Sequence, residues 1–313
     1  MREGRKSARE RRELLRGNSE TIVVHTIKAP AKLNIRLKVT GRRPDGYHDL
    51  VSIMVPIDVF DVLKMQGIPE GVVFSSRGLK VPGDERNLVV KAAKAFFDKT
   101  GLNKGVSIRL DKRIPVAAGM GGGSSDAAAV LLLLNQVCSE PLSREDLRAT
   151  ARDLGADVPF FLASKASLAR GIGDILELIE AWPDFRYVVV TPPIQVSTAW
   201  VYRNLQLKEL TRDEYHHIND MLREKPAAIA RILENDLESV TSAKFPVIET
   251  IKHVLLDLGA EGALMTGSGP TVFGVFLSPR QAEAARNHLL SQKLGDVFLA
   301  RKWEREDWGV VKR

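Results

Sequence analysis

The sequence is short of cysteine and of long apolar runs. Its 313 residues contain one cysteine, Cys138, so a disulfide within the chain is excluded and a reducing, cytoplasmic setting is expected. The longest apolar run, at residues 127–134, is far shorter than the roughly 18 residues that a membrane-spanning helix needs. Cysteine and histidine clusters at metal-ligand spacing are also missing. We therefore expect a globular protein with no membrane partner and no metal centre of that kind.

The charge gives little support to nucleic-acid binding. The net charge is +7, but residues 1–16 hold seven basic and three acidic side chains, a surplus of four, which leaves a surplus of three elsewhere. A basic stripe on a folded surface, the usual footprint of a nucleic-acid-binding domain, is not indicated. We expect residues 1–20 to form a basic disordered extension. A nucleic-acid-binding arm, a transit peptide and a start codon placed too early remain open as alternatives.

What the chain does have is an alternation of strand and helix patterns. β-branched, partly alternating segments predict strands. Capping residues, among them Asn87 and Ser143, and stop glycines delimit helices. The predicted strands span residues 21–27, 33–39, 50–59, 106–110, 167–170, 175–179, 187–191, 262–265, 271–277 and 297–302. The predicted helices span residues 87–100, 125–138, 143–155, 198–205, 212–223, 226–234, 246–258 and 279–291. The pattern favours an α+β fold with two domains that meet near residues 164–167.

The most informative segment is the glycine-rich stretch Pro-Val-Ala-Ala-Gly-Met-Gly-Gly-Gly-Ser-Ser-Asp at residues 115–126. It follows a predicted strand and leads into a predicted helix, so its backbone N–H groups and the helix dipole favour a bound phosphate. It is not a P-loop, because no lysine lies between Lys112 and Lys165. The segment predicts a nucleotide-phosphate site. A flexible Gly-Ser loop that leads into a buried helix is the alternative.

Four further residues are candidates to act on the same ligand. Lys32 and Asn34 lie two apart on a predicted strand and so share a face, although solvated strand residues would show the same pattern. Asp157 precedes the apolar segment Val-Pro-Phe-Phe and is either a catalytic carboxylate or a helix N-cap. Ser268 lies in a second glycine loop, Thr-Gly-Ser-Gly-Pro-Thr at residues 266–271. That loop is either a tight turn or a second anion site.

Three of these segments, in this order, resemble the motifs of the GHMP kinases: Pro-Ala-Lys-Leu-Asn at residues 30–34, Gly-Met-Gly-Gly-Gly-Ser-Ser-Asp at residues 119–126, and Thr-Gly-Ser-Gly-Pro-Thr at residues 266–271. Residues 31–34, 41–48 and 155–161 resemble the group of this superfamily that phosphorylates 4-diphosphocytidyl-2-C-methyl-D-erythritol. The resemblance covers residues 26–302 and implies the two-domain GHMP kinase fold. A ribosomal-protein-like ATP-binding domain would span residues 21–165 and an α/β sandwich substrate-binding domain residues 166–302, followed by a tail at residues 303–313.

The resemblance also implies the roles of individual residues. It assigns catalysis to Lys32, which offsets developing charge, and to Asp157, which orients or deprotonates the substrate hydroxyl. Mg²⁺ would arrive with ATP and be held mainly by phosphate oxygens. The implied ATP-binding residues are Pro115, Val116, Ala117, Ala118, Gly119, Met120, Gly121, Gly122, Gly123, Ser124 and Ser125. The implied substrate-binding residues are Asn34, Tyr47, His48, Thr198, Tyr202, Ser268 and Gly269, with simple helix packing as the alternative for Tyr202.

The implied reaction is ATP-dependent phosphorylation of the 2-hydroxyl of this cytidyl diphosphate, in the non-mevalonate route to isoprenoid precursors. The enzyme would be a monomer or weak homodimer with a small-molecule substrate and no nucleic-acid partner. Another small-molecule GHMP kinase, of the homoserine or mevalonate type, is the nearer alternative. An RNA-binding protein is the remoter one.

Overall fold

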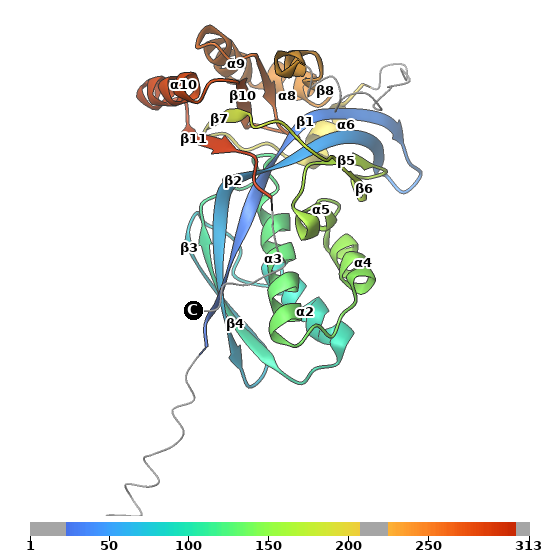
Figure 1. The fold of residues 1–313 in the computed structure, drawn as a ribbon. Coiled ribbons are helices and arrows are strands. Elements are labelled where there is room, and N and C mark those ends of the chain that lie inside the picture. The colour runs from blue at the N-terminus through green and yellow to red at the C-terminus, as the bar shows by residue number, and fades with distance from the viewer. Residues whose placement is uncertain (1–22, 207–224, 305–313) are drawn as a thin grey trace, which may run out of the picture.

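The computed structural model describes residues 23–206 and 225–304. Within them, two β-sheets and the helices that cover them form an elongated molecule of two stacked parts (Figure 1). This arrangement confirms the predicted α+β fold. The predicted helix at residues 212–223 and the predicted extension at residues 1–20 lie outside the described residues.

The larger sheet has seven strands, in the order β3-β4-β2-β1-β8, with β5 beside β2 and β6 beside β5. These strands are β1 (His25–Arg42), β2 (His48–Ile68), β3 (Val72–Gly78), β4 (Gly105–Lys112), β5 (Ser167–Arg170), β6 (Ile175–Leu178) and β8 (Glu234–Asn235). The β3/β4 and β1/β8 pairs are parallel, and the other pairs are antiparallel.

Two of these strands are longer than the sequence predicts. β1 joins the strands expected at residues 21–27 and 33–39, and β2 runs past the expected end at residue 59 to Ile68. Proline lacks the N–H that a sheet ladder needs and is usually confined to edges and bulges. β1 passes through Pro30 with a register shift between Pro30 and Ala31. The irregularity accommodates the proline, so the strand continues where the sequence pattern indicated a break.

The smaller sheet is antiparallel, in the order β11-β7-β10-β9. Its strands are β7 (Arg186–Thr191), β9 (Gly262–Met265), β10 (Val272–Phe276) and β11 (Asp296–Arg301). The helices α9 (Val247–Asp257) and α10 (Pro279–Gln292) cover its outer face, at the top of Figure 1. Its inner face packs against β1 and β2, where Tyr187 and Phe273 meet Leu33 and Val55 in one apolar cluster.

The two sheets do not divide the chain at one point. β5 and β6, at residues expected to open the second domain, belong to the larger sheet, where β5 pairs with β2 and β6 pairs with β5. The chain then enters the smaller sheet at β7 and returns once to the larger one for β8, which pairs with β1. The expected division at residues 165/166 therefore stays a prediction.

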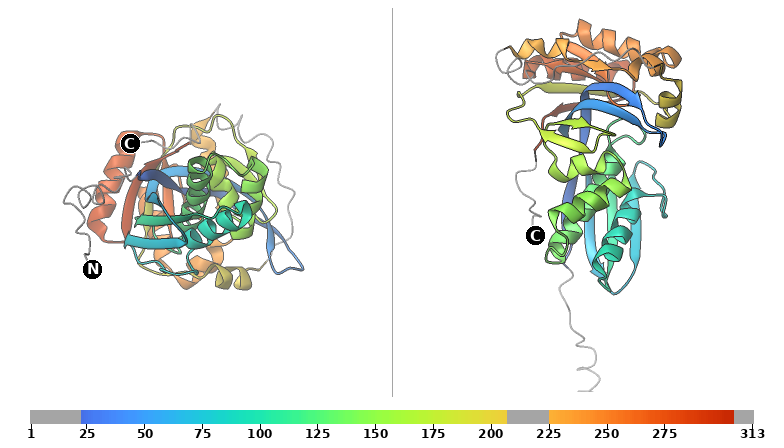
Figure 2. Two further views of the ribbon diagram at one scale, coloured as in Figure 1. Left: turned by 90° about the horizontal axis from the view of Figure 1, so that it is seen from below. Right: turned by 90° about the vertical axis from the view of Figure 1, so that its right-hand side faces the viewer.

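Four helices lie against one side of the larger sheet, as Figure 2 shows: α2 (Leu88–Thr100), α3 (Gly122–Val137), α4 (Arg144–Leu154) and α5 (Val158–Ala163). The predicted caps are confirmed, since the side chain of Asn87 accepts from Val89 N at 2.9 Å and that of Ser143 from Asp146 N at 3.1 Å. α3 begins at Gly122 rather than at residue 125, so two glycines of the loop belong to its first turn.

The remaining helices flank the smaller sheet. They are α6 (Thr198–Asn204), the 3₁₀ helix η1 (Pro226–Arg231) and α8 (Glu238–Lys244). The sequence predicted a longer α-helix at residues 226–234 and did not predict α8, α5 or β3. None of the helices in the described part of the chain has the length and apolar character that crossing a bilayer requires.

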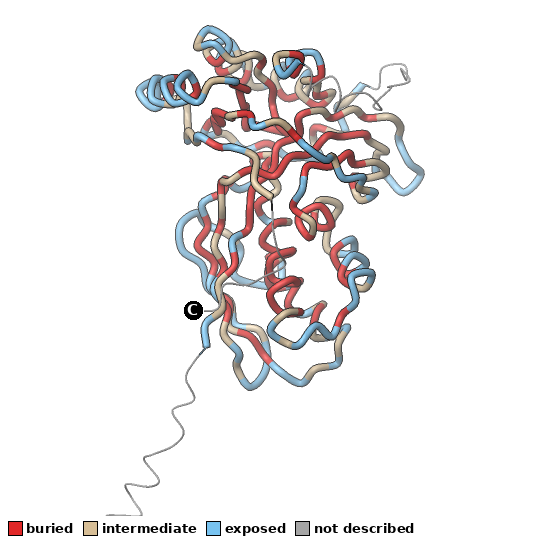
Figure 3. The backbone as a smooth tube through the Cα atoms, in the orientation of Figure 1, coloured by how far each residue is buried: buried red, intermediate tan, exposed pale blue. Residues whose placement is uncertain are grey.

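Strand β1 takes part in all three apolar cores of the described residues, which appear as red tube in Figure 3. Ile27 packs in the core beneath α2 and α3, and Leu33 in the core between the two sheets. Leu37 packs in the core beneath α9 and α10. One strand thus connects the interior of the whole molecule.

A buried ionic cluster supports the start of α3. Lys112 Nζ lies 2.5 Å from Asp61 Oδ2 and 2.8 Å from Asp126 Oδ2, and all three side chains are nearly inaccessible. Asp61 Oδ1 accepts from the backbone N of Arg113 and Ile114 at 2.6 and 2.9 Å. Asp126 Oδ1 has no hydrogen-bond partner among the described residues. Burial raises the pKa of Asp126 to about 7, although Lys112 opposes the shift.

This cluster predicts a pH dependence of stability. An unfolded aspartate has a pKa of about 3.9, so between about pH 4 and 7 the folded chain holds a proton that the unfolded chain has lost. The free energy of unfolding should therefore fall as the pH rises through this window. The side chain of the Asp126→Asn variant stays uncharged at every pH. In urea denaturation, its free energy of unfolding should therefore fall by at least about 1 kcal/mol less than that of the wild type between pH 5 and pH 8.

The matched control is Asp98→Asn, which removes a carboxylate from the exposed face of α2. It should keep the pH dependence of the wild type. An Asp126→Asn protein whose stability changes with pH as the wild type does would contradict the raised pKa of this carboxyl.

Candidate active site

A cleft of about 1150 Å³ lies where the glycine loop, β1 and the loop between β9 and β10 meet. Most of the predicted site residues line it: Lys32, Asn34, Tyr47, His48, Pro115, Val116, Ala117, Ala118, Gly119, Gly121, Gly122, Gly123, Ser124, Asp157, Thr198, Tyr202 and Ser268. Segments that are far apart in the sequence thus share one cavity. The sequence predicted the residues but not their arrangement.

Three predicted residues do not line the cleft. Met120 and Ser125 are buried: Met120 packs in the apolar cluster between the two sheets, and Ser125 lies in the first turn of α3. Gly269 faces the protein interior, since a Cβ there would lie 2.4 Å from Met265 Sδ. Its backbone N donates to Thr266 O at 3.0 Å, so this glycine shapes the loop rather than the cavity wall.

Two glycines of the loop combine a positive φ with a position that leaves no room for a Cβ. Gly119 has φ +80°, and a Cβ on it would lie 2.1 Å from Thr266 O. Gly121 has φ +70°, and a Cβ on it would lie 2.8 Å from the ring of Phe161. The loop therefore runs close to two neighbouring segments with its backbone accessible at the cleft. A backbone of this kind at the start of a helix is suited to hold phosphate groups.

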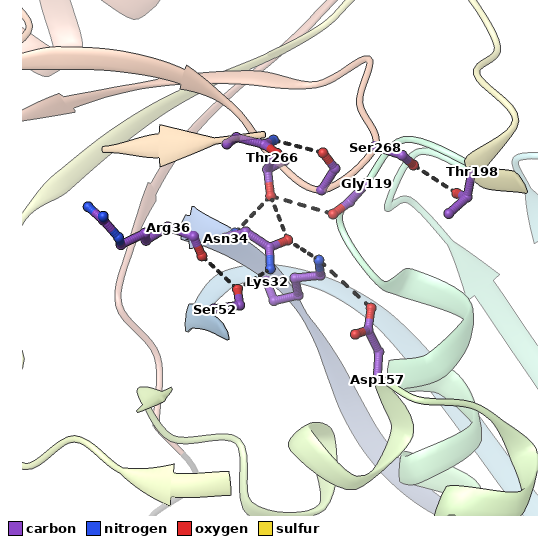
Figure 4. A network of polar contacts seen from close by, with 11 residues as sticks. Lys32, Asn34, Arg36, Ser52, Gly119, Asp157, Thr198, Thr266 and Ser268 are labelled. Atoms are coloured by element: carbon purple, nitrogen blue, oxygen red, sulfur yellow. Dashed lines mark hydrogen bonds and ion pairs between the residues drawn. The ribbon is translucent and has the colours of Figure 1, made fainter. Parts of the chain in front are cut away.

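Lys32 is a buried cation that lines the cleft. Lys32 is 4% exposed. Its Nζ donates to Asn34 Oδ1 and lies 3.8 Å from Asp157 Oδ2 (Figure 4). Burial lowers the pKa of Lys32, and the Asp157 carboxylate opposes that shift. The backbone N of Lys32 donates to Met120 O at 3.0 Å, which attaches β1 to the glycine loop. The alternative of a solvated strand lysine is therefore wrong.

Asp157 lies opposite Lys32, directly before α5. Its side chain is 36% exposed, so the carboxylate is accessible from the cleft. It makes no capping hydrogen bond to α5, and its backbone is already in the helical region at φ −82° and ψ −13°. Asp157 thus occupies the N-cap position of α5, but its carboxylate does not cap the helix and instead lies opposite Lys32, accessible from the cleft.

Asn34 holds Lys32 from behind. Its Nδ2 donates to Ser52 Oγ at 2.8 Å, and Ser52 Oγ donates in turn to Arg36 O at 2.7 Å. These bonds orient the amide so that Oδ1 faces the lysine ammonium (Figure 4). Asn34 is 3% exposed, so it too is not a solvated strand residue.

The other end of the cleft is aromatic. The rings of His48 and Tyr202 stack with centroids 4.9 Å apart at 27°. Burial raises the pKa of Tyr202 to about 12, so its phenol keeps its proton near neutral pH. The rings of His48 and Tyr202 are too close together for a nucleotide base to lie between them. Tyr47, which also lines the cleft, is 59% exposed. Nearby, the hydroxyls of Thr198 and Ser268 are hydrogen-bonded at 2.7 Å.

The sequence reasoning missed some polar residues of the site. Lys112 and Asp126, of the ionic cluster described above, also line the cleft. Thr266, next to the predicted Ser268, contacts both β1 and the glycine loop. Lys112 and Asp126 border the glycine segment in sequence, so a search for charged residues at its two ends would have found them. Groups of three or more metal-ligating side chains are not found in the described residues.

Comparison with known proteins is consistent with this geometry. The family "GHMP kinases N terminal domain" matches residues 87–165, and the family "GHMP kinases C terminal" matches residues 218–295. The 4-diphosphocytidyl-2-C-methyl-D-erythritol kinase of Syntrophotalea carbinolica is 46% identical over 268 residues, which cover 84% of this chain and 94% of that protein. The kinase of the same name from Geobacter metallireducens is 47% identical over 261 residues, which cover 83% and 92%.

Solved structures have the same fold. The crystal structure of a 4-(cytidine 5'-diphospho)-2C-methyl-D-erythritol kinase matches with a TM-score of 0.76 at 36% identity, covering 88% of this chain and 98% of that one. A homoserine kinase from Cytophaga hutchinsonii matches with a TM-score of 0.72 at 19% identity, over 94% of this chain and 99% of that one, which supports the fold alone. The chain therefore belongs to the GHMP kinases and, within them, to the 4-diphosphocytidyl-2-C-methyl-D-erythritol kinase family.

Proposed function

We propose that the protein transfers the γ-phosphoryl group of ATP to the 2-hydroxyl of 4-diphosphocytidyl-2-C-methyl-D-erythritol, in the non-mevalonate route to isoprenoid precursors. The observation that carries the proposal is the Lys32–Asp157 pair, 3.8 Å apart, in one cleft with a glycine loop and an aromatic end. Relatives at 46% and 47% identity bear the name of this kinase.

In the proposed complex, the ATP triphosphate lies along the glycine loop, at the start of α3. The backbone at Gly119 and Gly121 has no Cβ to obstruct it, and Ser124 adds a hydroxyl at the cleft. The loop thus fits a phosphate chain, since backbone donors and the helix dipole favour the negative charge. Mg²⁺, bound mainly by phosphate oxygens and close to Ser124, would neutralise part of that charge.

The transfer itself requires positioning and charge stabilisation more than covalent chemistry. The substrate hydroxyl donates to the Asp157 carboxylate, which directs the oxygen at the γ-phosphorus and receives the proton as the new O–P bond forms. The bond between the γ-phosphorus and the bridging oxygen breaks, and ADP leaves. The Lys32 ammonium offsets the charge that develops between the two ligands.

The aromatic end of the cleft is the proposed site of the cytidine group. Tyr47 offers an exposed ring face there, with His48 and Tyr202 stacked beside it. Asn34, Thr198 and Ser268 offer polar groups to the diphosphate and the polyol. We propose that residues 21–165 mainly bind ATP and that residues 166–302 complete the substrate site, in a cytoplasmic monomer or weak homodimer without a nucleic-acid partner.

Removal of the Asp157 carboxylate should abolish most of the transfer. Asp157→Ala should lower kcat by at least about a hundredfold, the usual scale for loss of an acid–base or positioning group. The measurement is steady-state ADP release in a coupled assay with the cytidyl diphosphate. The matched control is Asp153→Ala on the exposed face of α4, which removes a carboxylate four residues away. Near-normal kcat in Asp157→Ala would contradict its catalytic role.

Substrate choice is tested with a panel of alcohols. We expect ADP release with 4-diphosphocytidyl-2-C-methyl-D-erythritol and at least about a hundredfold lower kcat/KM with homoserine and mevalonate, because a site built for a base leaves its polar groups unpaired without one. Turnover of homoserine or mevalonate in preference to the cytidyl diphosphate would overturn the assignment and favour the alternative kinase types.

A further inference from the structure

Thr266 is a buried threonine at the meeting point of three segments. It follows β9, is fully buried, and does not line the cleft. Its Oγ1 accepts from the backbone N of Asn34 at 2.8 Å, and it lies 3.5 Å from Asn34 Oδ1 and from Gly119 O (Figure 4). The hydroxyl of Thr266, in the second glycine loop, thus contacts both β1 and the first glycine loop at residues 115–126.

The backbone N–H of Asn34 needs this acceptor because of its place in the sheet. β1 pairs with β2 through Asn34, where the register then shifts before Arg36, and with β8 at Arg36 and Leu37. The N–H of Asn34 comes before the β8 pairing begins, so the sheet supplies it with no acceptor on that side. Buried backbone donors are nearly always paired. Thr266 Oγ1 supplies that acceptor at 2.8 Å.

The same threonine also fixes the glycine loop. A Cβ on Gly119 would lie 2.1 Å from Thr266 O, and one on Gly267 would lie 3.0 Å from Gly119 O. The two glycine loops are therefore in backbone contact, with Thr266 between the first loop and Asn34. Since Asn34 Oδ1 accepts from Lys32 Nζ, a shift of Thr266 would move the lysine relative to the phosphate-binding loop.

We propose that Thr266 is a positioning residue, whose hydroxyl sets the placement of the Lys32 ammonium against the glycine loop through Asn34. It touches neither proposed substrate, because it lies behind the cleft wall. The inference rests on the proposed function only where turnover is the measurement.

The first test compares Thr266→Val, which removes the hydroxyl at nearly constant shape, with Thr266→Ser, which keeps it. We expect Thr266→Val to lower kcat by about tenfold or more with both KM values within about threefold of wild type, because a small misplacement of a catalytic group is costly. Thr266→Ser should recover most of the lost rate. The matched control is Thr191→Val on β7, which removes a buried hydroxyl that is hydrogen-bonded to Thr271 Oγ1 at 2.9 Å.

A purely structural role is separated by two further measurements. The stoichiometry of ATP-analogue binding should stay near that of the wild type, so the loss of kcat does not reflect fewer folded molecules. A double-mutant cycle combines Thr266→Val with Asn34→Ala and expresses each loss of kcat as an activation free energy. The double mutant should lose clearly less than the sum of the two single losses, because the threonine acts through the asparagine. Additive effects, an unchanged kcat or a proportionate loss of binding sites would each overturn the inference.

A crystal structure of Thr266→Val gives a result that does not depend on the substrate. We expect Lys32 Nζ to leave hydrogen-bond distance of Asn34 Oδ1, and an unmoved Lys32 would overturn the inference. If the wild-type enzyme does not turn over the cytidyl diphosphate, the proposed function fails, while this structure still decides the role of Thr266.

Discussion

The site depends on one buried ammonium, that of Lys32. An ammonium removed from water is costly unless it is paired and hydrogen-bonded. Lys32 is 4% exposed and has an amide oxygen on one side and a carboxylate on the other. Each partner comes from a different part of the fold, Asn34 from β1 itself and Asp157 from the start of α5. Because Lys32 needs both partners, α5 is held against β1, and the Asp157 carboxylate stays accessible from the cleft.

The two glycine loops solve a related problem of space. A phosphate-binding backbone must lie close to β1 and also close to the second sheet, and side chains at these contacts would keep the segments apart. At Gly119 a Cβ would lie 2.1 Å from Thr266 O, and at Gly121 one would lie 2.8 Å from Phe161. Glycine at these positions thus serves packing as much as ligand access. This explains why the loop that we propose binds phosphate has a cation nearby although it has no P-loop lysine, since close backbone approach brings in Lys32 from another strand.

Much of this could be predicted from the sequence, because the motifs are local. The strand, glycine loop and helix around residues 115–126 were predicted in order, as were the caps Asn87 and Ser143. The failures concern pairing between distant segments. The continuity of β1 through Pro30 depends on a bulge against β2, and the inclusion of β5 and β6 in the larger sheet depends on β2 as well. Thr266 was missed because its hydroxyl acquires a role only when Asn34, 232 positions away, lies beside it. The roles of individual residues remain predictions.

Strand β1 has a consequence for how the molecule loses its structure. Its 18 residues cross from the helical core, through the layer between the sheets, to the core beneath α9 and α10. Units that open separately share few buried contacts, whereas here each core loses part of its lining if β1 detaches from any one of them. We therefore expect the two parts of this kinase to lose their structure together, as one cooperative unit joined by β1.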